Sequence, residues 1–424
     1  MKTRSVLVSI HSLCRLGIAF FFLTILSIAS PVPAGAEELP GGLDPARLER
    51  ISDHFRKHLE SGEMRGGQAL IWRKGEVAYS ETWGLRDHQG EKPVEEDTLF
   101  RIYSMTKPIT SVAVMMLYEE GHFLLRDPAS RFLPELAELS VIGTDGEKAP
   151  PITIRDLLRH TSGMTYGLFS GTPVDRAYLD AGILTEDTIG EMVKNLGELP
   201  LLFPPGSRWH YSVSTDVLGR LIEVVSGKSF GEFLEERLFE PLGMDDTSFT
   251  VPASKADRFA RLYARVPGEN GGLTFGEPPE GWNRTYAPGA TFQGGGGGLV
   301  STAGDFLRFC RMLLGDGQLD GVRILSRKSV ELMRTDHMGD VAVKYPFPGH
   351  GFGLGFTMVT DPGAGGELGS VGAYRWAGAA GTGFFIDPRE EMIGIFMTQV
   401  LPAASGQSVH RKEFRRLAYQ AIGD

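Results

Sequence analysis

Strand patterns occupy both ends of this 424-residue chain, and helical patterns fill the middle. Near the start, residues 66–84 alternate in strand fashion, and a tight turn is expected at Lys74-Gly75. Near the end, residues 384–388 and 392–397 form a second pair of short strands. Because short strands joined by turns pair antiparallel, we expect the two ends of the chain to build one antiparallel sheet together.

Apolar residues repeat at helical spacing between these strand groups. The clearest helix carries Ile109, Val112 and Met116 on one face. Its start lies near Ser104, because Pro108 lacks an N–H and is best tolerated in a first turn. Further helices are expected at residues 154–159, 217–225, 230–239, 305–314 and 409–422, the last of which is able to lie on the sheet.

The pattern predicts one α+β catalytic unit over residues 37–424, built from two parts. An antiparallel sheet flanked by helices takes about 37–105 and 290–424, and a mostly helical subdomain takes about 106–289. Within the helical part, residues 245–289 are rich in Pro and Gly and are expected to form surface connections. The interface between the two parts is the natural place for a cleft.

Residues 1–36 are typical of a secretory signal peptide. Lys2 and Arg4 give a positive start, residues 16–28 are apolar, and small residues follow at 34–36. The apolar core is shorter than the ~20 residues that a spanning helix needs. We therefore expect export to the periplasm or the cell exterior, with cleavage and no stable membrane insertion; the alternative is an uncleaved anchor.

The net charge and the cysteine content limit the classes of partner and of covalent cross-link that are expected. The formal net charge is −10 and no basic run stands out, so a nucleic-acid partner is not expected. Cys14 lies inside the signal segment, and Cys310 lies in an amphipathic helix pattern typical of a buried small hydrophobe. Neither predicts a disulfide, so stability has to come from a hydrophobic core.

The tetrapeptide Ser104-Met105-Thr106-Lys107 carries the strongest chemical signal. Residues three apart on a helix are neighbours, so the Lys107 amine can reach the Ser104 oxygen. A serine hydroxyl becomes a useful nucleophile when a nearby base takes its proton. The alternative for the tetrapeptide alone is a capping serine followed by a solvated lysine.

Two further stretches can complete an acyl-transfer site. Tyr211 is a second candidate base, because a lysine ammonium nearby would stabilise its phenolate; an ordinary half-buried tyrosine is the alternative. Residues 376–381 are mostly small, which lets the backbone approach a ligand and offer N–H groups to an oxyanion. A glycine-rich bend in the sheet is the alternative there.

Other hydrolase patterns fit less well. Ser229 lies in a G-x-S-x-G match, but the segment before it is helical rather than a strand, so we expect Ser229 to cap the next helix. His160 is expected at a helix end and turn rather than in a triad. The glycine run at 294–298 lacks a following Lys-Ser/Thr and is expected to form turns and closely packed strands. There is no H-E-x-x-H metalloprotease pattern.

Taken in order, these residues resemble the serine beta-lactamase superfamily, specifically its class C and family VIII carboxylesterase branch. Supporting stretches are residues 157–163, 241–244 and 295–302. The resemblance covers nearly all of the chain after residue 36. It implies a beta-lactamase/transpeptidase-like fold.

The resemblance also implies roles for individual residues. Ser104 would be the nucleophile, Lys107 and Tyr211 the base system, and the backbone N–H groups of Ser104 and Ala379 the oxyanion hole. Which of Lys107 and Tyr211 takes the serine proton stays open, so we treat them as a coupled pair. No metal or organic cofactor is implied.

The departures from the family pattern bear on the substrate. Val213 stands where penicillin-recognising members carry the asparagine of Y-x-N, and Trp376-Ala377-Gly378 stands where they carry K-T-G. The predicted substrate-binding positions are therefore Val213, Trp376 and Gly378, and Arg375 is the candidate for a substitute charge. A site without amide and carboxylate readers loses discrimination for beta-lactams, so an uncharged small-molecule ester is the expected substrate.

The function predicted from the resemblance is an exported serine hydrolase that cleaves esters through an acyl-serine intermediate. A beta-lactamase or D-Ala-D-Ala carboxypeptidase is the first alternative. A non-catalytic cell-wall binding or sensor protein on the same fold is the second. Acyl transfer to an alcohol or amine instead of water stays open. Pocket walls are expected from residues 165–200 and 245–289.

Overall fold

Eight strands from both ends of the chain form one antiparallel sheet, in the order β10-β11-β12-β13-β14-β1-β2-β3. Strand β1 (Gly66–Arg73) pairs with β2 (Glu76–Asp87) on one side and with β14 (Met392–Thr398) on the other. This confirms the sheet predicted from the two ends. The other strands are β3 (Lys92–Pro93), β10 (His350–Phe352), β11 (Thr357–Val359), β12 (Tyr374–Ala377) and β13 (Gly383–Asp387).

The structure is a computed structural model, and its described residues are 40–168, 171–185, 187–267, 273–279, 282, 286–342, 345–401 and 407–424. The predicted signal segment, with Cys14, lies outside them. The described residues belong to one compact unit that contains both the sheet part and the helical part. Within them, no helix has the length and apolar character needed to cross a membrane.

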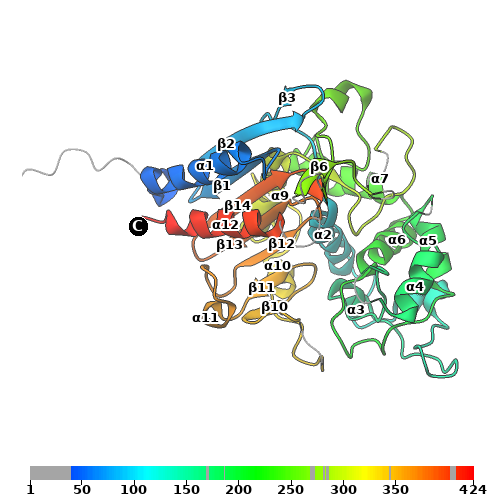
Figure 1. The fold of residues 1–424 in the computed structure, drawn as a ribbon. Helices are drawn as coiled ribbons and strands as arrows, with labels where there is room; N and C mark the ends of the chain where they lie inside the picture. The colour runs from blue at the N-terminus through cyan, green and yellow to red at the C-terminus, as the bar shows by residue number, and fades with distance from the viewer. Residues whose placement is uncertain are drawn as a thin grey trace, which may run out of the picture. The chain divides into compact units, whose positions relative to one another are not determined.

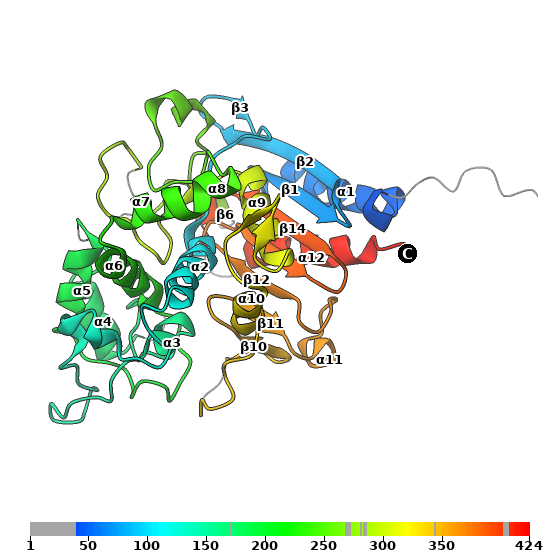
Figure 2. The same cartoon turned by 180° about the vertical axis from the view of Figure 1, so that it is seen from behind.

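Side chains alternate between two cores because successive residues of a strand point to opposite faces. On β1, Ala69 and Ile71 join a cluster with residues of α1 (Pro45–Glu60) and α12 (Gln407–Gln420), whereas Leu70 joins the main core on the other face. Figure 1 shows α1 and α12 side by side over one face of the sheet. Figure 2, seen from behind, shows α9 (Ala303–Leu314) over the opposite face.

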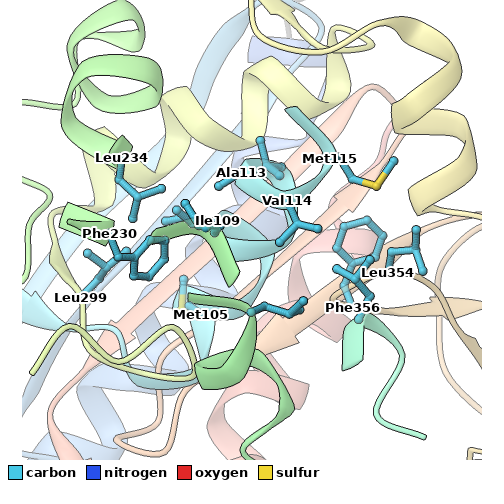
Figure 3. Close-up of a cluster of buried hydrophobic side chains, with 14 of the residues drawn as sticks. Met105, Ile109, Ala113, Val114, Met115, Phe230, Leu234, Leu299, Leu354 and Phe356 are labelled. Carbon is cyan, nitrogen blue, oxygen red and sulfur yellow. The ribbon is translucent and has the colours of Figure 1, made fainter. Parts of the chain in front are cut away.

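Helix α2 (Thr106–Glu119) is the centre of the main core. Its residues from Thr106 to Leu117 are all buried, which is typical of a helix enclosed on every side rather than of a surface helix. Figure 3 shows Ile109 and Val114 among side chains from several elements, including Phe230 and Leu354. The position of α2, and of the turn that precedes it, is therefore set by packing all around the helix.

The predicted helices are confirmed, with shifts of a few residues at their ends. Residues 230–239 form α7 and then a π-helical turn, Glu235–Phe239, which leads into α8. The remaining helices are α3 (Ile154–Leu158), α4 (Pro173–Asp180), α5 (Ile189–Leu196), α6 (Ser214–Ser226), α7 (Phe230–Leu234), α8 (Glu240–Leu242), α10 (Arg327–Met333) and α11 (Pro362–Gly365). Of these, α4, α5, α8, α10 and α11 were not predicted.

The prediction that residues 245–289 form only surface connections is wrong. They include β5 (Tyr263–Pro267) and β6 (Leu273–Gly276), and β5 pairs in parallel with β15 (Val400–Leu401). The partner strand lies far away in the chain, so local sequence patterns do not reveal the pair. Two short ladders complete the strands: β4 (Phe100–Arg101) with β7 (Val300–Ser301), and β8 (Gln318–Leu319) with β9 (Val322–Arg323).

Candidate active site

Ser104 lies in a 3₁₀ turn, Tyr103–Met105, between β4 and α2. The α-helix itself begins at Thr106, two residues after Ser104, so the prediction of a helix start near Ser104 is close. Tyr103 has a φ of +43°, in the left-handed region that side chains rarely adopt. The turn is therefore sharp, and it presents the half-buried Ser104 at the cleft.

The structure brings Ser104, Lys107 and Tyr211 together. Tyr211 OH donates a hydrogen bond to Ser104 Oγ at 2.6 Å. Lys107 Nζ lies 3.4 Å from the same oxygen. The S-x-x-K spacing places the amine near the serine, and the segment before α6 brings in the phenol.

Lys107 is completely buried, and its amine is held by two other groups. Nζ lies 2.6 Å from the carbonyl oxygen of Gly296 and 2.8 Å from Tyr166 OH. Burial lowers the pKa of Lys107 to about 7, an effect that the charge of Asp216 opposes. A large fraction of the amine is therefore neutral at neutral pH and able to accept a proton.

Tyr211 lies among aromatic rings. Its ring centroid is 4.9 Å from that of His160, 5.3 Å from that of Tyr166 and 5.7 Å from that of Trp376. Burial raises the pKa of Tyr211 above its ordinary value, although the hydrogen bond with Ser104 lowers it. The expected phenolate is therefore disfavoured, and the phenol is arranged as a proton donor.

The Lys107 amine is surrounded by a hydrogen-bonded group of residues that the sequence did not predict. The group consists of Tyr166, Asp216 and the glycine run at 294–298. The Gly296 N–H donates to Asp216 Oδ1 at 2.8 Å, and Tyr166 OH lies 3.4 Å from Asp216 Oδ2. A Cβ at Gly296 would lie 2.3 Å from Asp216 Oδ2, so a larger residue there would displace the Asp216 carboxylate. The density of glycines at 294–298 was the only available signal, and the predicted close packing is confirmed.

The bend after β12 approaches the serine turn. A Cβ on Gly378 would lie 2.3 Å from the carbonyl oxygen of Ile102, two residues before Ser104. In the part of the chain that the structure describes, neither the Ser104 nor the Ala379 amide N–H has a hydrogen-bond acceptor. Both N–H groups are therefore available to an anionic oxygen, as the prediction of an oxyanion hole requires.

Arg411 on α12 is hydrogen-bonded to the bend that follows β12. Its Nη1 donates to the carbonyl oxygens of Gly378 at 2.9 Å and of Thr382 at 3.1 Å. The Gly378 N–H donates in turn to the Thr382 carbonyl. The residues that flank Ala379 are thus tied to α12, and Arg411 itself lines the cleft.

The predicted substrate-binding positions fall in different places. Trp376 and Gly378 line the cleft, whereas Val213 is 0% exposed and packs in the main core. Val213 therefore presents no surface to a substrate in this structure, because the chain turns inward there to begin α6. Arg375 is paired with Glu367 at 2.7 Å and lies 2.8 Å from His350 Nε2, so its charge is already engaged.

A cleft of about 1130 Å³ lies beside Ser104. The two segments that were predicted to form its walls do contribute: 165–200 supplies Leu168, and 245–289 supplies Trp282. Residues from 345–350 also line the cleft, which was not predicted. Apolar and aromatic side chains make up much of the lining of the cleft; they include Tyr103, Tyr166, Leu168, Leu179, Leu184, Trp209, Trp282, Tyr286, Phe292, Tyr345, Phe347 and Trp376.

The competing serine and histidine have structural roles. Ser229 caps α7, where its Oγ accepts from the Glu232 N–H and the Glu232 side chain accepts from the Ser229 N–H. This confirms the predicted helix cap. His160 follows the end of α3 with a φ of +57°, which confirms the predicted turn, and burial lowers its pKa well below the ordinary value.

Comparisons with known proteins identify the family of this chain. The family model described as Beta-lactamase matches residues 51–417. Esterase EstB from Burkholderia gladioli is 33% identical over 81% of this chain and 88% of its own length. Lovastatin esterase from Penicillium rubens is 31% identical over 82% of this chain and 92% of its own length.

Solved structures give the same result. The structure titled "EstCE1, a hydrolase with promiscuous acyltransferase activity" superposes with a TM-score of 0.75 and 28% identity, and the match covers 89% of this chain and 98% of that one. The predicted beta-lactamase/transpeptidase-like fold is confirmed. The chain therefore belongs to the beta-lactamase family, as a carboxylesterase-like serine hydrolase.

Proposed function

We propose that this protein hydrolyses small-molecule esters through an acyl intermediate on Ser104. The observation that carries the proposal is the position of Ser104 Oγ, 2.6 Å from Tyr211 OH and 3.4 Å from the buried Lys107 amine. A nucleophile, a group with a pKa of about 7 and a neutral proton donor converge on one oxygen. The esterase names of two relatives support the same reaction class.

Lys107 is the proposed base for the first step. A neutral amine has two hydrogens and one lone pair. The hydrogens are used by the Gly296 carbonyl and Tyr166 OH, which leaves the lone pair for the proton of Ser104. As the Ser104 Oγ–carbon bond forms, negative charge develops on the substrate carbonyl oxygen, next to the N–H groups of Ser104 and Ala379.

Tyr211 is the proposed donor to the leaving group. When the ester C–O bond breaks, the departing alkoxide takes a proton from Tyr211, which is replenished from the Lys107 ammonium. The product alcohol then leaves. Water next attacks the acyl-Ser104 carbonyl and gives a proton to Lys107. As the bond between the acyl carbon and Ser104 Oγ breaks, Oγ takes a proton from Tyr211, which the Lys107 ammonium replenishes, and the carboxylic acid leaves.

The cleft favours an uncharged substrate with an apolar acyl or alcohol group. Aromatic side chains form much of its wall, and Trp376 occupies the place of the lysine in K-T-G. Arg375, the nearest alternative cation, is paired with Glu367. These features support ester hydrolysis over the alternatives of a beta-lactamase, a D-Ala-D-Ala carboxypeptidase and a non-catalytic binding protein.

Acyl transfer to a small alcohol is a second candidate, supported by the likeness to the structure titled as a hydrolase with promiscuous acyltransferase activity. In that reaction an alcohol takes the place of water in the second step. Added methanol would then yield a methyl ester in competition with the acid. Product analysis by chromatography distinguishes the two outcomes.

The test of the main proposal compares p-nitrophenyl butyrate with nitrocefin. We expect ester turnover that Ser104→Ala abolishes, with little nitrocefin cleavage. Ser229→Ala is the matched control, because Ser229 caps an exposed helix start and should leave turnover unchanged. Ester turnover that persists in a folded Ser104→Ala variant contradicts the proposal, and fast nitrocefin cleavage favours the beta-lactamase.

We also propose that the protein is exported. The support is the composition of residues 1–36, with a positive start, an apolar core and small residues at 34–36. Mass spectrometry of the protein recovered outside the cytoplasm tests this, with a new N-terminus near residue 37 as the expected result. Full-length protein found only in the cytoplasm contradicts it.

A further inference from the structure

Three histidines meet between α1 and α12, on the face of the sheet that α9 does not cover. His54 and His58 lie one helical turn apart on α1, so they share a face. His410 on α12 faces them: its ring centroid is 4.8 Å from that of His58 and 6.0 Å from that of His54. One ring nitrogen from each residue lies within 4.8 Å of the other two. We call these three residues the histidine cluster.

Two of these imidazoles have a buried nitrogen without a hydrogen-bond partner. Among the described residues, neither His54 Nε2 nor His410 Nδ1 has a donor or acceptor within reach. Leaving a buried polar atom without a hydrogen-bond partner destabilises the folded protein. Two such atoms in one cluster, each with a lone pair available in the right tautomer, are explained by a shared electrophilic ligand.

His58 completes the arrangement. Its Nδ1 is hydrogen-bonded to the Glu63 carboxylate, which leaves Nε2 as its available nitrogen. Histidines that bind metals usually donate their other ring N–H to a carboxylate or carbonyl in this way, which fixes the tautomer. The His58 side chain is 23% exposed, so an ion has a path from solvent.

We propose that His54 Nε2, His58 Nε2 and His410 Nδ1 bind a divalent transition-metal ion, with Zn²⁺ as the best fit. Neutral imidazole suits Zn²⁺, which prefers four ligands in a tetrahedron. The fourth is water on the exposed side of His58. Zn–N bonds of about 2.0–2.1 Å require ligand nitrogens about 3.3 Å apart. Small side-chain rotations close the remaining gap.

The ion would join two helices from opposite ends of the chain. His54 and His58 belong to the first helix and His410 to the last. His410 also directly precedes Arg411, which holds the carbonyls of Gly378 and Thr382. The proposed metal site thus has a structural role, distinct from the acyl-transfer chemistry proposed above. Its test does not depend on whether that chemistry is correct.

Calorimetric titration of the chelator-treated full chain with ZnCl₂ tests the site. We expect one Zn²⁺ per chain, a rise in Tm with the ion, and the visible absorption of tetrahedral Co²⁺ when CoCl₂ replaces zinc. His54→Gln and His410→Gln should each weaken binding at least about tenfold, and Glu63→Gln about 10–100-fold. His122→Gln is the matched control, since His122 is an exposed histidine beside Glu120.

Equal zinc affinity in His410→Gln and the original protein would overturn the proposal, as would a stoichiometry well below one. Circular dichroism and ester turnover establish that each variant is folded. Glu63 is exposed, so Glu63→Gln keeps the test decisive if a variant of the buried His410 does not fold. Unchanged zinc affinity in a folded Glu63→Gln variant would then overturn the proposed ligand arrangement.

Discussion

Lys107 Nζ lies 2.6 Å from the carbonyl oxygen of Gly296, a residue far along the chain from the S-x-x-K motif. This contact takes one hydrogen of the amine, and Tyr166 OH at 2.8 Å takes a second. The two contacts orient the amine, and burial lowers its pKa to about 7. The proposed base thus depends on residues that the motif does not contain.

The pH dependence of ester hydrolysis should follow Lys107. Because the neutral amine is the proposed base, kcat/KM should rise with pH, reach half its maximum near pH 7 and level off above it. At one pH unit below the pKa, about one tenth of the maximum remains. A stopped-flow or spectrophotometric pH–rate profile with an uncharged ester measures this.

Lys107→Arg is the informative variant for the same prediction, because a guanidinium stays protonated at all accessible pH values. It should lose activity across the whole range rather than shift the profile. A profile of the original enzyme that is flat from pH 6 to 8 would contradict the role of Lys107.

Tyr166→Phe should lower kcat about fivefold with a small change in KM. The substitution removes the oxygen that accepts from the Lys107 amine at 2.8 Å, and one hydrogen bond is worth about 1 kcal/mol. Since that bond favours the protonated amine, the midpoint of the pH profile should move below its original value. Tyr118→Phe, at the far end of α2, should change neither kcat nor the midpoint.

Gly296→Ala should reduce kcat at least about tenfold while the protein stays folded. An added Cβ would lie 2.3 Å from Asp216 Oδ2 and 2.6 Å from Tyr166 OH, so both groups would have to move away from Lys107. Gly297→Ala is the matched control, because its Cβ would have no neighbour closer than 3.4 Å. Similar kinetics for the two variants would remove the proposed role of Gly296.

Arg411→Met should lower kcat with little effect on KM. Arg411 is proposed as a positioning residue, since its guanidinium donates to the carbonyls of Gly378 and Thr382. Loss of one direct oxyanion donor costs about 10²–10³ in kcat, so a smaller loss of about tenfold is expected for a displaced bend. Arg416→Met, an exposed change on the same helix, should behave like the original enzyme. Equal losses in the two variants would indicate general damage to α12.

Features that depend on residues close together in the chain could be predicted. Ser104 and Lys107 are three residues apart, so helical geometry alone brings them together. The turn at Lys74-Gly75 joins β1 to β2, and both residues have positive φ. Ser229 caps α7, as a serine at the start of a helix commonly does.

Features that depend on distant residues could not be predicted in the same way. Strands β5 and β15 pair across a long separation, so neither carried a clear strand signal on its own. Val213 looked like a substrate position because of its spacing from Tyr211, but it is buried in the core. The pKa values of Lys107 and Tyr211 depend on burial, which only the folded chain creates.

The sequence by itself determined the antiparallel sheet from both ends and the Ser104–Lys107 pair, because local periodicity and motif spacing encode them. The role of Tyr211 as a candidate partner was implied by the resemblance to the family. The tertiary structure alone decided which groups hold the Lys107 amine, how Arg411 braces the bend at Gly378, and that His410 meets His54 and His58. Those contacts join segments that are far apart in the chain, and they form only when the helices pack on the sheet.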